Sequence, residues 1–369
     1  MASPYELLGL EPVINASATL TKLGGSVMPE EVVSAMVQAS RSFIDLFDLQ
    51  DQVGRKIAEM TRNEACYVCS GAAAGIALAV ASCVTGTNED LVFDFPKLDR
   101  APRIEVIVFK ASRNGYDYAI TQTGVKVVEI GSEPADLEAA INDRTACIVW
   151  FAGRLAENAL PIEQVVAIAK PRGVPVLVDA AAQIPPQSSL WHFTTEVGCT
   201  GAIFSGGKGI RGPQSSGLIL GTKELINGVK LNGPPNHSFG RPMKVGKEEL
   251  VGLLAAVEYT LAQDEDAIIR EYEEIVHGWM EDLAGLPGIT TERRFPSEAG
   301  QPHARAIVHV GPEAAKTRDE IVDELWTGNP KIAVSSTNIE PDAFGLNPQT
   351  LNRDEAEIVS RRIRQILGK

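Results

Sequence analysis

The sequence predicts an α/β fold with a mostly parallel sheet, followed by a smaller α+β region. Seven apolar runs of strand length alternate with helical or loop segments through the first two thirds of the chain. These runs lie near residues 65–69, 104–109, 125–130, 145–151, 175–179, 201–204 and 216–220. Because strand–helix–strand alternation usually builds a parallel sheet, we expect helices to cover both of its faces.

The N-terminal region has a different pattern. Residues 1–28 open with an amphipathic piece and continue with a small, polar stretch at 13–21, which we expect to be a loop near a ligand. A helix should begin at Pro29 and end near Ala39, since proline is favoured in the first turn. A second helix is predicted over 48–61, where Leu49, Val53 and Ile57 share one stripe.

The C-terminal third predicts a second, smaller domain. A long helical stretch covers 246–283, with a break expected near 263–267. Strands are expected at 288–292, 304–310 and 331–335, and helices at 317–326 and 353–367. A chain of 369 residues can hold one large and one smaller domain. We therefore predict a large domain at 29–245, a small domain at 246–369, and a segment at 1–28 that packs with the small domain.

The composition of the chain limits the classes of partner that it can bind. Hydrophobic residues make up 44% of the chain and charged residues 22%, as in a soluble globular protein. The net charge of −14 argues against a nucleic-acid partner, which needs a basic surface, but leaves small anionic ligands open. The start of the chain does not look like a signal peptide, and the apolar run at 71–84 is too short to span a bilayer. We expect a protein without a membrane segment.

The cysteines and histidines do not predict a metal or disulfide site. Five scattered cysteines lack the spacing of a disulfide framework, which favours a cytoplasmic location. Cys66 and Cys69 form a C-x-x-C, but an odd offset on a strand sends their thiols to opposite faces. We expect both to pack in the core. The five histidines form no ligand cluster, so no metal is predicted.

One lysine occupies an unusual position. Lys208 lies in the glycine-rich stretch SGGKGIRGPQ at 205–214, directly after an apolar strand. A partly buried lysine has a lowered pKa, and such an amine can form a Schiff base. Ser205 could offer its hydroxyl and backbone N–H to a phosphate on the same turn. We interpret Lys208 as the lysine that binds pyridoxal 5′-phosphate (PLP); the alternative is a solvated lysine on a surface turn.

A carboxylate follows another buried strand. Asp179 ends the run VLVD at 176–179, and ligands in open α/β sheets bind where strands end. A PLP enzyme needs a carboxylate that keeps the pyridine nitrogen protonated. Gln183 could donate to the phenolic oxygen of the cofactor, and the alanines before it leave room for a flat ring. The alternative for Asp179 is the N-cap of a helix.

A third segment suits an anion. The stretch SGAAAG at 70–75 joins a strand to a helix, and small residues allow backbone N–H groups to approach a phosphate. We assign Ser70, Gly71 and Ala72 to the PLP phosphate. The spacing matches neither the P-loop nor the G-x-G-x-x-G pattern, which disfavours a nucleotide.

The order of these sites, phosphate loop, aspartate and lysine, is that of PLP enzymes with the aspartate-aminotransferase fold. The chain resembles the selenocysteine-synthase-like family, which includes L-seryl-tRNA(Sec) selenium transferase and D-glucosaminate-6-phosphate ammonia-lyase. The resemblance covers almost the whole chain and is carried by NASATLTKLGG at 15–25, SGAAAG at 70–75, VDAAAQ at 178–183, FSGGKGIRGPQ at 204–214, GRPMKVGKEE at 240–249 and NPQTL at 347–351.

The resemblance implies a homodimer or larger assembly with shared active sites, and Lys208 as Schiff-base lysine and proton shuttle. Two features depart from the family. The tRNA-dependent members carry an extra N-terminal domain, whereas this chain starts almost at the core, so we expect a small amino substrate and no tRNA. Ser112 stands where relatives often have a histidine that contacts the cofactor ring.

Several cations near predicted strand ends or after the lysine turn are candidates for the cofactor phosphate or a substrate anion: Arg113, Arg154, Arg211, Arg241, Lys244 and Lys247. Arg211 is the favoured one, since it lies three residues beyond Lys208. For Arg305, on a C-terminal strand, the resemblance implies contact with the substrate carboxylate. The alternative for each is a solvated surface charge.

These observations predict a PLP-dependent lyase. We expect the Lys208 aldimine to exchange with an amino acid or amino-sugar acid, and the freed lysine to remove the α-proton. Elimination of a β-hydroxyl would then yield a keto acid and ammonia. The alternatives are β-replacement on seryl-tRNA, racemisation or aldol cleavage through the same carbanion, and a PLP-binding scaffold without activity.

Overall fold

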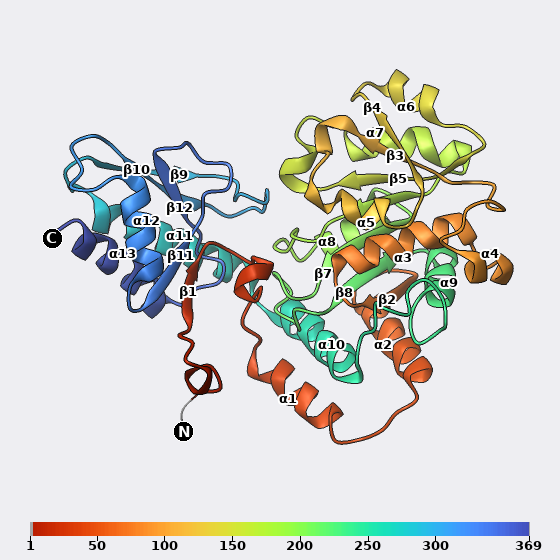
Figure 1. Ribbon diagram of the computed structural model, residues 1–369, viewed down its shortest axis with the longest axis horizontal. Coiled ribbons are helices and arrows are strands. Elements are labelled where there is room, and N and C mark those ends of the chain that lie inside the picture. The colour runs from red at the N-terminus through yellow and green to blue at the C-terminus, as the bar shows by residue number, and fades with distance from the viewer. Residues whose placement is uncertain (1–2, 369) are drawn as a thin grey trace. The chain divides into compact units, whose positions relative to one another are not determined.

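The computed structural model describes residues 3–368 and divides them into two compact units (Figure 1). We call residues 28–263 the large unit, and residues 3–27 together with 264–368 the small unit. The second boundary lies later than the expected residue 246. The reason is that α10 (Lys247–Ala262) packs on α1 (Glu30–Ala39) and α2 (Leu46–Met60), and so belongs to the large unit.

The large unit contains a seven-stranded sheet. Its strand order is β2 (Ala65–Cys69), β8 (Gly217–Gly221), β7 (Gly201–Ser205), β6 (Val176–Asp179), β5 (Thr145–Phe151), β3 (Glu105–Phe109) and β4 (Lys126–Ile130). Only β8 runs antiparallel to its neighbours. The predicted α/β class is confirmed, and the carboxyl ends of β2, β3, β5, β6 and β7 share one edge of the sheet.

Helices cover both faces of this sheet because most of its strands are apolar and buried on both sides, with the edge strand β4 as the exception. On one face, α3 (Ala72–Thr85), α5 (Tyr118–Thr121) and α9 (Lys223–Asn232) enclose one core cluster. On the other face, α2, α7 (Ile162–Ala169) and α10 enclose a second. Shorter helices are α4 (Glu89–Asp94), α6 (Pro134–Ala140) and α8 (Ser189–Trp191), the last followed by a π-helical turn at His192–Glu196.

The two cysteines of the C-x-x-C point to opposite faces, as predicted. Cys66 lies in the core cluster with α2, and Cys69 lies in the cluster with α3. Burial raises the pKa of the Cys69 thiol to about 12. Among residues 3–368, no group of three or more potential metal ligands is found.

The small unit has its own core. Its antiparallel sheet has the order β12 (Ala343–Leu346), β10 (Arg305–Val310) and β9 (Ile289–Arg294). The helices α11 (Glu265–Leu283), α12 (Arg318–Thr327) and α13 (Arg353–Ile366) pack around the same core cluster. Within it, the buried Trp279 ring donates from Nε1 to the carbonyl of Ala356 at 2.8 Å.

The loop predicted at 13–21 is wrong in its first part. Residues Val13–Ala16 form β1, which pairs in parallel with β11 (Lys331–Val334). No local pattern predicts a strand whose partner lies at the other end of the sequence. The rest of the stretch is irregular, and Ala18 has a φ of 75°. Strand β12 was also not expected. Short 3-10 turns lie at Glu6–Leu8, Thr21–Leu23, Gly115–Asp117 and Lys170–Arg172.

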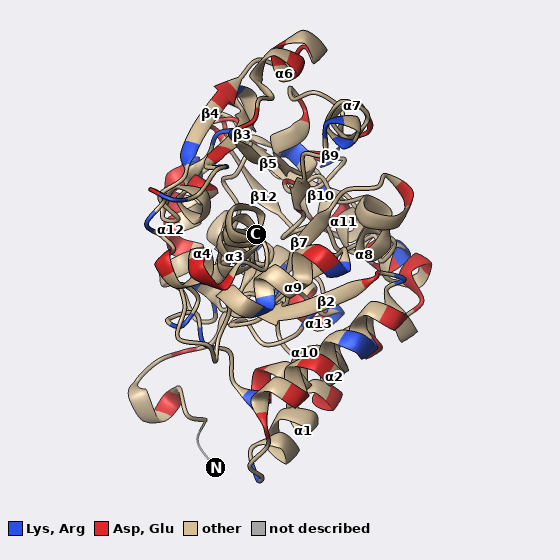
Figure 2. Cartoon of the chain, turned by 90° about the vertical axis from the view of Figure 1, so that its right-hand side faces the viewer, with Lys and Arg blue, Asp and Glu red and all other residues tan. Residues whose placement is uncertain are grey.

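Charge is distributed unevenly over the helices of the large unit. Both signs occur along α2, whereas the charged residues of α4 are all acidic, namely Glu89, Asp90 and Asp94 (Figure 2). None of the helices in the described part of the chain combines the length and apolar character needed to cross a membrane.

Candidate functional site

Five strand ends of the large unit bring the predicted residues to one edge of the sheet. Ser70 follows β2, and Ser112 lies in a turn after β3. A turn at Gly153–Ala156 follows β5, Asp179 ends β6, and Lys208 follows β7. The sheet register aligns Asp179 with Ile203, two residues before the end of β7. This edge, where the carboxyl ends of the parallel strands lie, is called the carboxyl edge. It therefore gathers residues that are widely separated in the sequence.

Backbone hydrogen bonds define the turn that carries Lys208. The N–H of Gly206 donates to Ser216 at 2.9 Å, and the N–H of Gly212 donates to Gly206 at 2.8 Å. The Arg211 N–H donates to the Lys208 carbonyl at 2.9 Å. Glycine is required at position 209, because a Cβ there would lie 2.0 Å from the carbonyl oxygen of Ile184. The lysine is thus presented from a closed and tightly packed turn.

The Lys208 side chain is half-buried, and within residues 3–368 its amine has no hydrogen bond or ion pair. Burial lowers the pKa of this amine, and the charge of Asp179 opposes the shift in part. A lowered pKa increases the neutral fraction of the amine near pH 7, which is the nucleophilic form. This environment differs from that of a solvated surface lysine.

Asp179 is half-buried at the end of β6. Its Oδ1 accepts from the N–H of Ala181 at 3.0 Å. Burial raises the pKa of the Asp179 carboxyl, while the Ala181 N–H and the charge of Lys208 lower it. The next helix begins only at Ser189, so the helix N-cap considered for Asp179 is not what the structure contains.

Asp179 and Lys208 influence each other without touching. Each charge shifts the pKa of the other group, yet no ion pair within 4 Å joins these two described residues. A carboxylate and an amine that are close enough to influence each other but are not paired suit a flat heterocycle between them. The pair matches the chemistry of PLP, whose ring nitrogen binds a carboxylate and whose aldehyde reacts with an amine.

The loop between β2 and α3 has the shape of an anion cradle. Gly71 precedes the helix with a φ of 130° and a ψ of 163°, a conformation that favours glycine. A Cβ at Gly217 would lie 2.8 Å from the carbonyl carbon of Gly71 and 3.1 Å from the nitrogen of Ala72. The first N–H groups of a 14-residue helix are open to an anion at this edge. These features fit the phosphate of PLP.

Ser205 and Gln183 lie beside Asp179. The N–H of Ser205 donates to the Ala181 carbonyl at 3.3 Å, and the N–H of Gln183 donates to Ala180 at 3.0 Å. Both residues are half-buried on the same edge of the sheet. Their contacts with a cofactor stay predictions.

Ser112 is buried, and its hydroxyl forms a hydrogen bond within the protein. Its hydroxyl donates to the carbonyl of Leu155 at 2.7 Å, which joins the turns after β3 and β5. The side chain is therefore engaged with the protein itself.

Two of the candidate arginines are held by carboxylates. The Arg113 guanidinium pairs with both Asp117 and Glu129, and these partners raise its pKa. Arg154 pairs with Glu157 at 3.3 Å. An anion would have to compete with these pairs, which weakens both as predicted anion sites.

The remaining cations of the large unit differ in their surroundings. Arg211 is exposed and its guanidinium carbon lies 5.8 Å from the ring centroid of Tyr259. Arg241 and Lys244 are exposed on the loop between α9 and α10, while Lys247 pairs with Glu248. Tyr259 was missed by sequence reasoning, because nothing in the stripe of α10 distinguishes it from a packing residue.

The role expected for Arg305 needs correction. The side chain is 0% exposed in the small unit. Its guanidinium donates to the carbonyls of Thr337 at 2.9 Å and Asn338 at 3.2 Å, and it lies 3.6 Å from Glu298. Arg305 thus supports the segment before β12 and offers no exposed surface to a substrate carboxylate.

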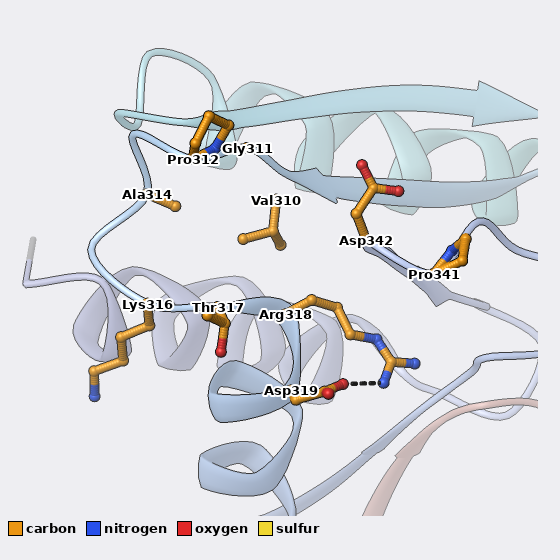
Figure 3. Close-up of a pocket in the computed structure, with 10 residues that line it drawn as sticks. All are labelled: Val310, Gly311, Pro312, Ala314, Lys316, Thr317, Arg318, Asp319, Pro341 and Asp342. Carbon is orange, nitrogen blue, oxygen red and sulfur yellow. Dashed lines mark hydrogen bonds and ion pairs between the residues drawn. The ribbon is translucent and has the colours of Figure 1, made fainter.

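A pocket of about 330 Å³ lies in the small unit beside the start of α12 (Figure 3). Its wall includes Lys316, Arg318 and two carboxylates, and Arg318 donates to Asp319 at 2.7 Å. None of the predicted site residues lines it. Its wall carries charges of both signs, so it does not resemble a dedicated anion site.

Comparison with known proteins adds three findings. The chain matches the family described as L-seryl-tRNA selenium transferase (SelA) over residues 13–272. It is 32% identical to a 5′-C-glycyluridine monooxygenase-decarboxylase from a Streptomyces species, over 98% of this chain and 92% of that protein. It is 28% identical to the D-glucosaminate-6-phosphate ammonia lyase of Salmonella typhimurium, over 98% of this chain and 97% of the relative.

Solved structures agree with the sequence relatives. A structure of D-glucosaminate-6-phosphate ammonia-lyase superposes with a TM-score of 0.86 at 28% identity, covering 100% of this chain and 98% of that one. The architecture is that of PLP enzymes of fold type I, as expected from the motif order.

Proposed function

The chain belongs to the L-seryl-tRNA selenium transferase family, and on that premise we propose that it is a PLP-dependent lyase. The substrate is a small amino acid or amino-sugar acid that carries a β-hydroxyl group. The observation that carries the proposal is the half-buried Lys208 amine, which shares the carboxyl edge with Asp179 but forms no ion pair with it.

When bound, PLP supplies an electron sink for negative charge that develops at the α-carbon of an amino substrate. Ser70, Gly71 and Ala72 hold its phosphate at the start of α3. Asp179, at the end of β6, would pair with the ring nitrogen, and its negative charge would keep that nitrogen protonated. Gln183 and Ser205 bind the polar edge of the ring from the turns beside these groups.

Lys208 has two roles in this proposal. Its Nζ holds the cofactor between turnovers and accepts the α-proton of the substrate during turnover. The lowered pKa favours both roles, because only the neutral amine can accept a proton. The turn around Gly209 presents the amine from a tightly packed backbone, since even a Cβ at Gly209 would meet the Ile184 carbonyl.

Elimination is the favoured outcome because a relative of almost equal length is named an ammonia lyase. Loss of the α-proton and the β-hydroxyl releases water, and hydrolysis of the remaining enamine gives a keto acid and ammonia. We expect β-replacement on seryl-tRNA to be disfavoured, since a net charge of −14 opposes binding of a polyanion. Racemisation, aldol cleavage and a scaffold without activity are the further outcomes that the same residues allow.

A second candidate function follows from the Streptomyces relative. Its name describes a monooxygenase-decarboxylase, and its identity to this chain is 32%. Oxygen-dependent decarboxylation would begin at the same α-carbon and use the same lysine. It differs in consuming O₂ and releasing CO₂.

We also propose that the chain forms a homodimer or a larger homo-oligomer and functions in the cytoplasm. Phe43 is 103% exposed, and Ile44 and Phe47 are 55% and 56% exposed, on the corner that joins α1 to α2. Clustered exposed apolar residues are typical of an interface. Changing all three to serine should yield monomers in light scattering, whereas serine at the isolated, exposed Phe93 should not. The five free cysteines support the proposed cytoplasmic location, because thiols stay reduced in that compartment.

The test of the activity uses the purified protein with added PLP. Absorbance is recorded while D- and L-amino acids and amino-sugar acids are added, and ammonia, keto acid, O₂ and CO₂ are assayed together. Ammonia with keto acid, without O₂ uptake, supports the lyase. O₂ uptake with CO₂ release supports the second candidate. A protein that binds no PLP and gives no product would refute both.

A further inference from the structure

Cys83 and Cys147 are two cysteines that the proposed function does not use, and their thiols share a hydrogen bond. Cys83 lies in the last turn of α3, Cys147 lies near the start of β5, and the helix packs on this strand. Cys147 belongs to the same core cluster as Val149, whereas Ile148 belongs to the cluster on the other side of the sheet. The Cys147 side chain therefore points toward α3.

The helix places Cys83 on its sheet-facing side. Ile76 and Val80 belong to the core cluster that contains Cys147, and Cys83 follows them on the same side of the helix, one and two turns later. Cys83 is only partly buried, whereas the other four cysteines are buried. Cys83 is therefore the thiol that an oxidant in solvent can reach.

The two thiols differ in reactivity. The hydrogen bond with Cys83 and burial both raise the pKa of the Cys147 thiol. Since the thiolate is the form that attacks an oxidant, Cys147 stays protonated and does not react by itself. Its sulfur nevertheless lies beside the Cys83 sulfur, in position to react once Cys83 has been oxidised. An exposed attacking thiol thus stands next to a buried resolving thiol.

We propose that Cys83 and Cys147 form a reversible disulfide when the protein meets a peroxide, and that this bond ties α3 to β5. The Cys83 thiolate attacks the O–O bond of hydrogen peroxide, takes up one oxygen as a sulfenic acid and releases hydroxide. The Cys147 sulfur then attacks the Cys83 sulfur, the S–O bond breaks, and the departing hydroxide leaves with the Cys147 proton as water. Two electrons pass from the sulfurs to the peroxide, and a thiol reductant reverses the bond.

Cys66 and Cys69 provide an internal comparison. They are much closer in the sequence, but they lie in core clusters on opposite sides of the sheet, so their thiols cannot meet while β2 is folded. A bond from Cys83 would fix α3 near its end, roughly 16 Å along the helix axis from Ala72. We therefore expect the bond to stabilise the large unit against unfolding.

The test exposes the reduced, purified protein with added PLP to hydrogen peroxide and maps its peptides by mass spectrometry without reductant. Trypsin leaves Cys83 on the peptide 63–97, which also holds Cys66, and leaves Cys147 on the peptide 145–154. We expect these peptides to be linked in the wild type and in the control Cys66→Ala, and dithiothreitol to separate them. The link should be absent from Cys83→Ala and from Cys147→Ala.

Two further readouts test the order of attack and the effect of the bond. Dimedone, which traps sulfenic acids, should label Cys83 in the Cys147→Ala protein, because that variant lacks the resolving thiol. The oxidised wild type should unfold at a temperature higher than the reduced protein by roughly 5–10 °C, and peroxide should cause no such rise in Cys83→Ala.

Four results would each overturn the proposal. They are an unlinked wild type, a link that persists in Cys83→Ala, dimedone on Cys147 in the Cys83→Ala protein, and an unchanged unfolding temperature of the linked wild type. If Cys147→Ala fails to fold, the peptide maps of the wild type and of Cys83→Ala still decide between a Cys83–Cys147 bond and none.

Discussion

A buried cation in the small unit and a half-buried cation in the large unit have opposite hydrogen-bonding surroundings. Arg305 in the small unit is wholly buried, and its guanidinium donates to the carbonyls of Thr337 and Asn338 with Glu298 nearby. Lys208 in the large unit is half-buried, and among the described residues its amine has no hydrogen bond or ion pair. The first cation is held by two hydrogen bonds and a nearby carboxylate, whereas the amine of the second is available for chemistry.

This difference separates structural charge from functional charge. A satisfied buried charge holds its neighbours, and its removal leaves them without partners. An unsatisfied one has a shifted pKa and destabilises the empty protein, which is typical of active sites. Removing Arg305 should therefore affect stability, while removing Lys208 should affect activity.

The largest effect is expected for Lys208→Ala. Turnover should fall by about 1,000-fold or more, because one change removes both the cofactor attachment and the proton acceptor. Product formation and retained cofactor absorbance measure the effect. Lys223→Ala, at an exposed lysine of the same unit, should leave both unchanged. An active Lys208→Ala protein would contradict the proposed role.

Arg305→Met should destabilise the small unit by about 3–5 kcal/mol, since it leaves two carbonyls without their donor and removes the positive charge beside Glu298. Urea unfolding followed by tryptophan fluorescence measures this, because Trp279 reports on that core. Arg293→Met, which removes an exposed pair with Glu273 at 2.7 Å, should change stability by less than about 1 kcal/mol. Equal effects of the two changes would show that burial does not distinguish them.

Asp179→Asn should lower turnover by roughly 100-fold, as the loss of one preorganised electrostatic partner commonly does. The asparagine oxygen can still accept from the Ala181 N–H, so the fold should persist. Asp51→Asn, at an exposed carboxylate paired with Lys230, is the control. Full activity of Asp179→Asn would remove the carboxylate from the site.

Gly209→Ala should destabilise the large unit by about 1–3 kcal/mol, the usual range for overpacking, because the new Cβ meets the Ile184 carbonyl at 2.0 Å. Turnover should fall as well, since the lysine turn must shift. Gly115→Ala is the matched control, as no atom lies within 4 Å of its Cβ position. A stable and active Gly209→Ala protein would show that the turn is not tightly packed.

The smallest effect is expected for the pH dependence of the free energy of unfolding in the protein without cofactor. The pKa of Lys208 is lowered by folding from the ordinary 10.5, so below its folded pKa the protonated amine destabilises the fold. Lys208→Met should therefore be the more stable protein at neutral pH. As pH rises toward 10.5 the unfolded chain binds more protons than the folded one, and the wild type should approach the variant. Urea unfolding at several pH values tests this, and a gap that widens with pH would contradict it.

Much of the site follows from local patterns. The glycines around Lys208, the aspartate after a buried strand and the small residues at 70–75 each predict a role that depends on neighbouring residues alone. The carboxyl edge then follows from the rule that parallel strands end together. Partners distant in sequence were not predictable: Arg113 meets Glu129 only through the fold, and Tyr259 reaches Arg211 from a later helix.

The sequence by itself determined the alternation of strands and helices in the large unit, the break between α10 and α11, and the lysine on its glycine turn, because periodicity and turn chemistry are local properties. The tertiary structure decided the pairing of β1 with β11, the position of α10 in the large unit, and the burial of Arg305. Those features depend on contacts between residues far apart in the chain. No window of the sequence holds both partners, so only the folded structure shows which cation is held by the protein and which is available for chemistry.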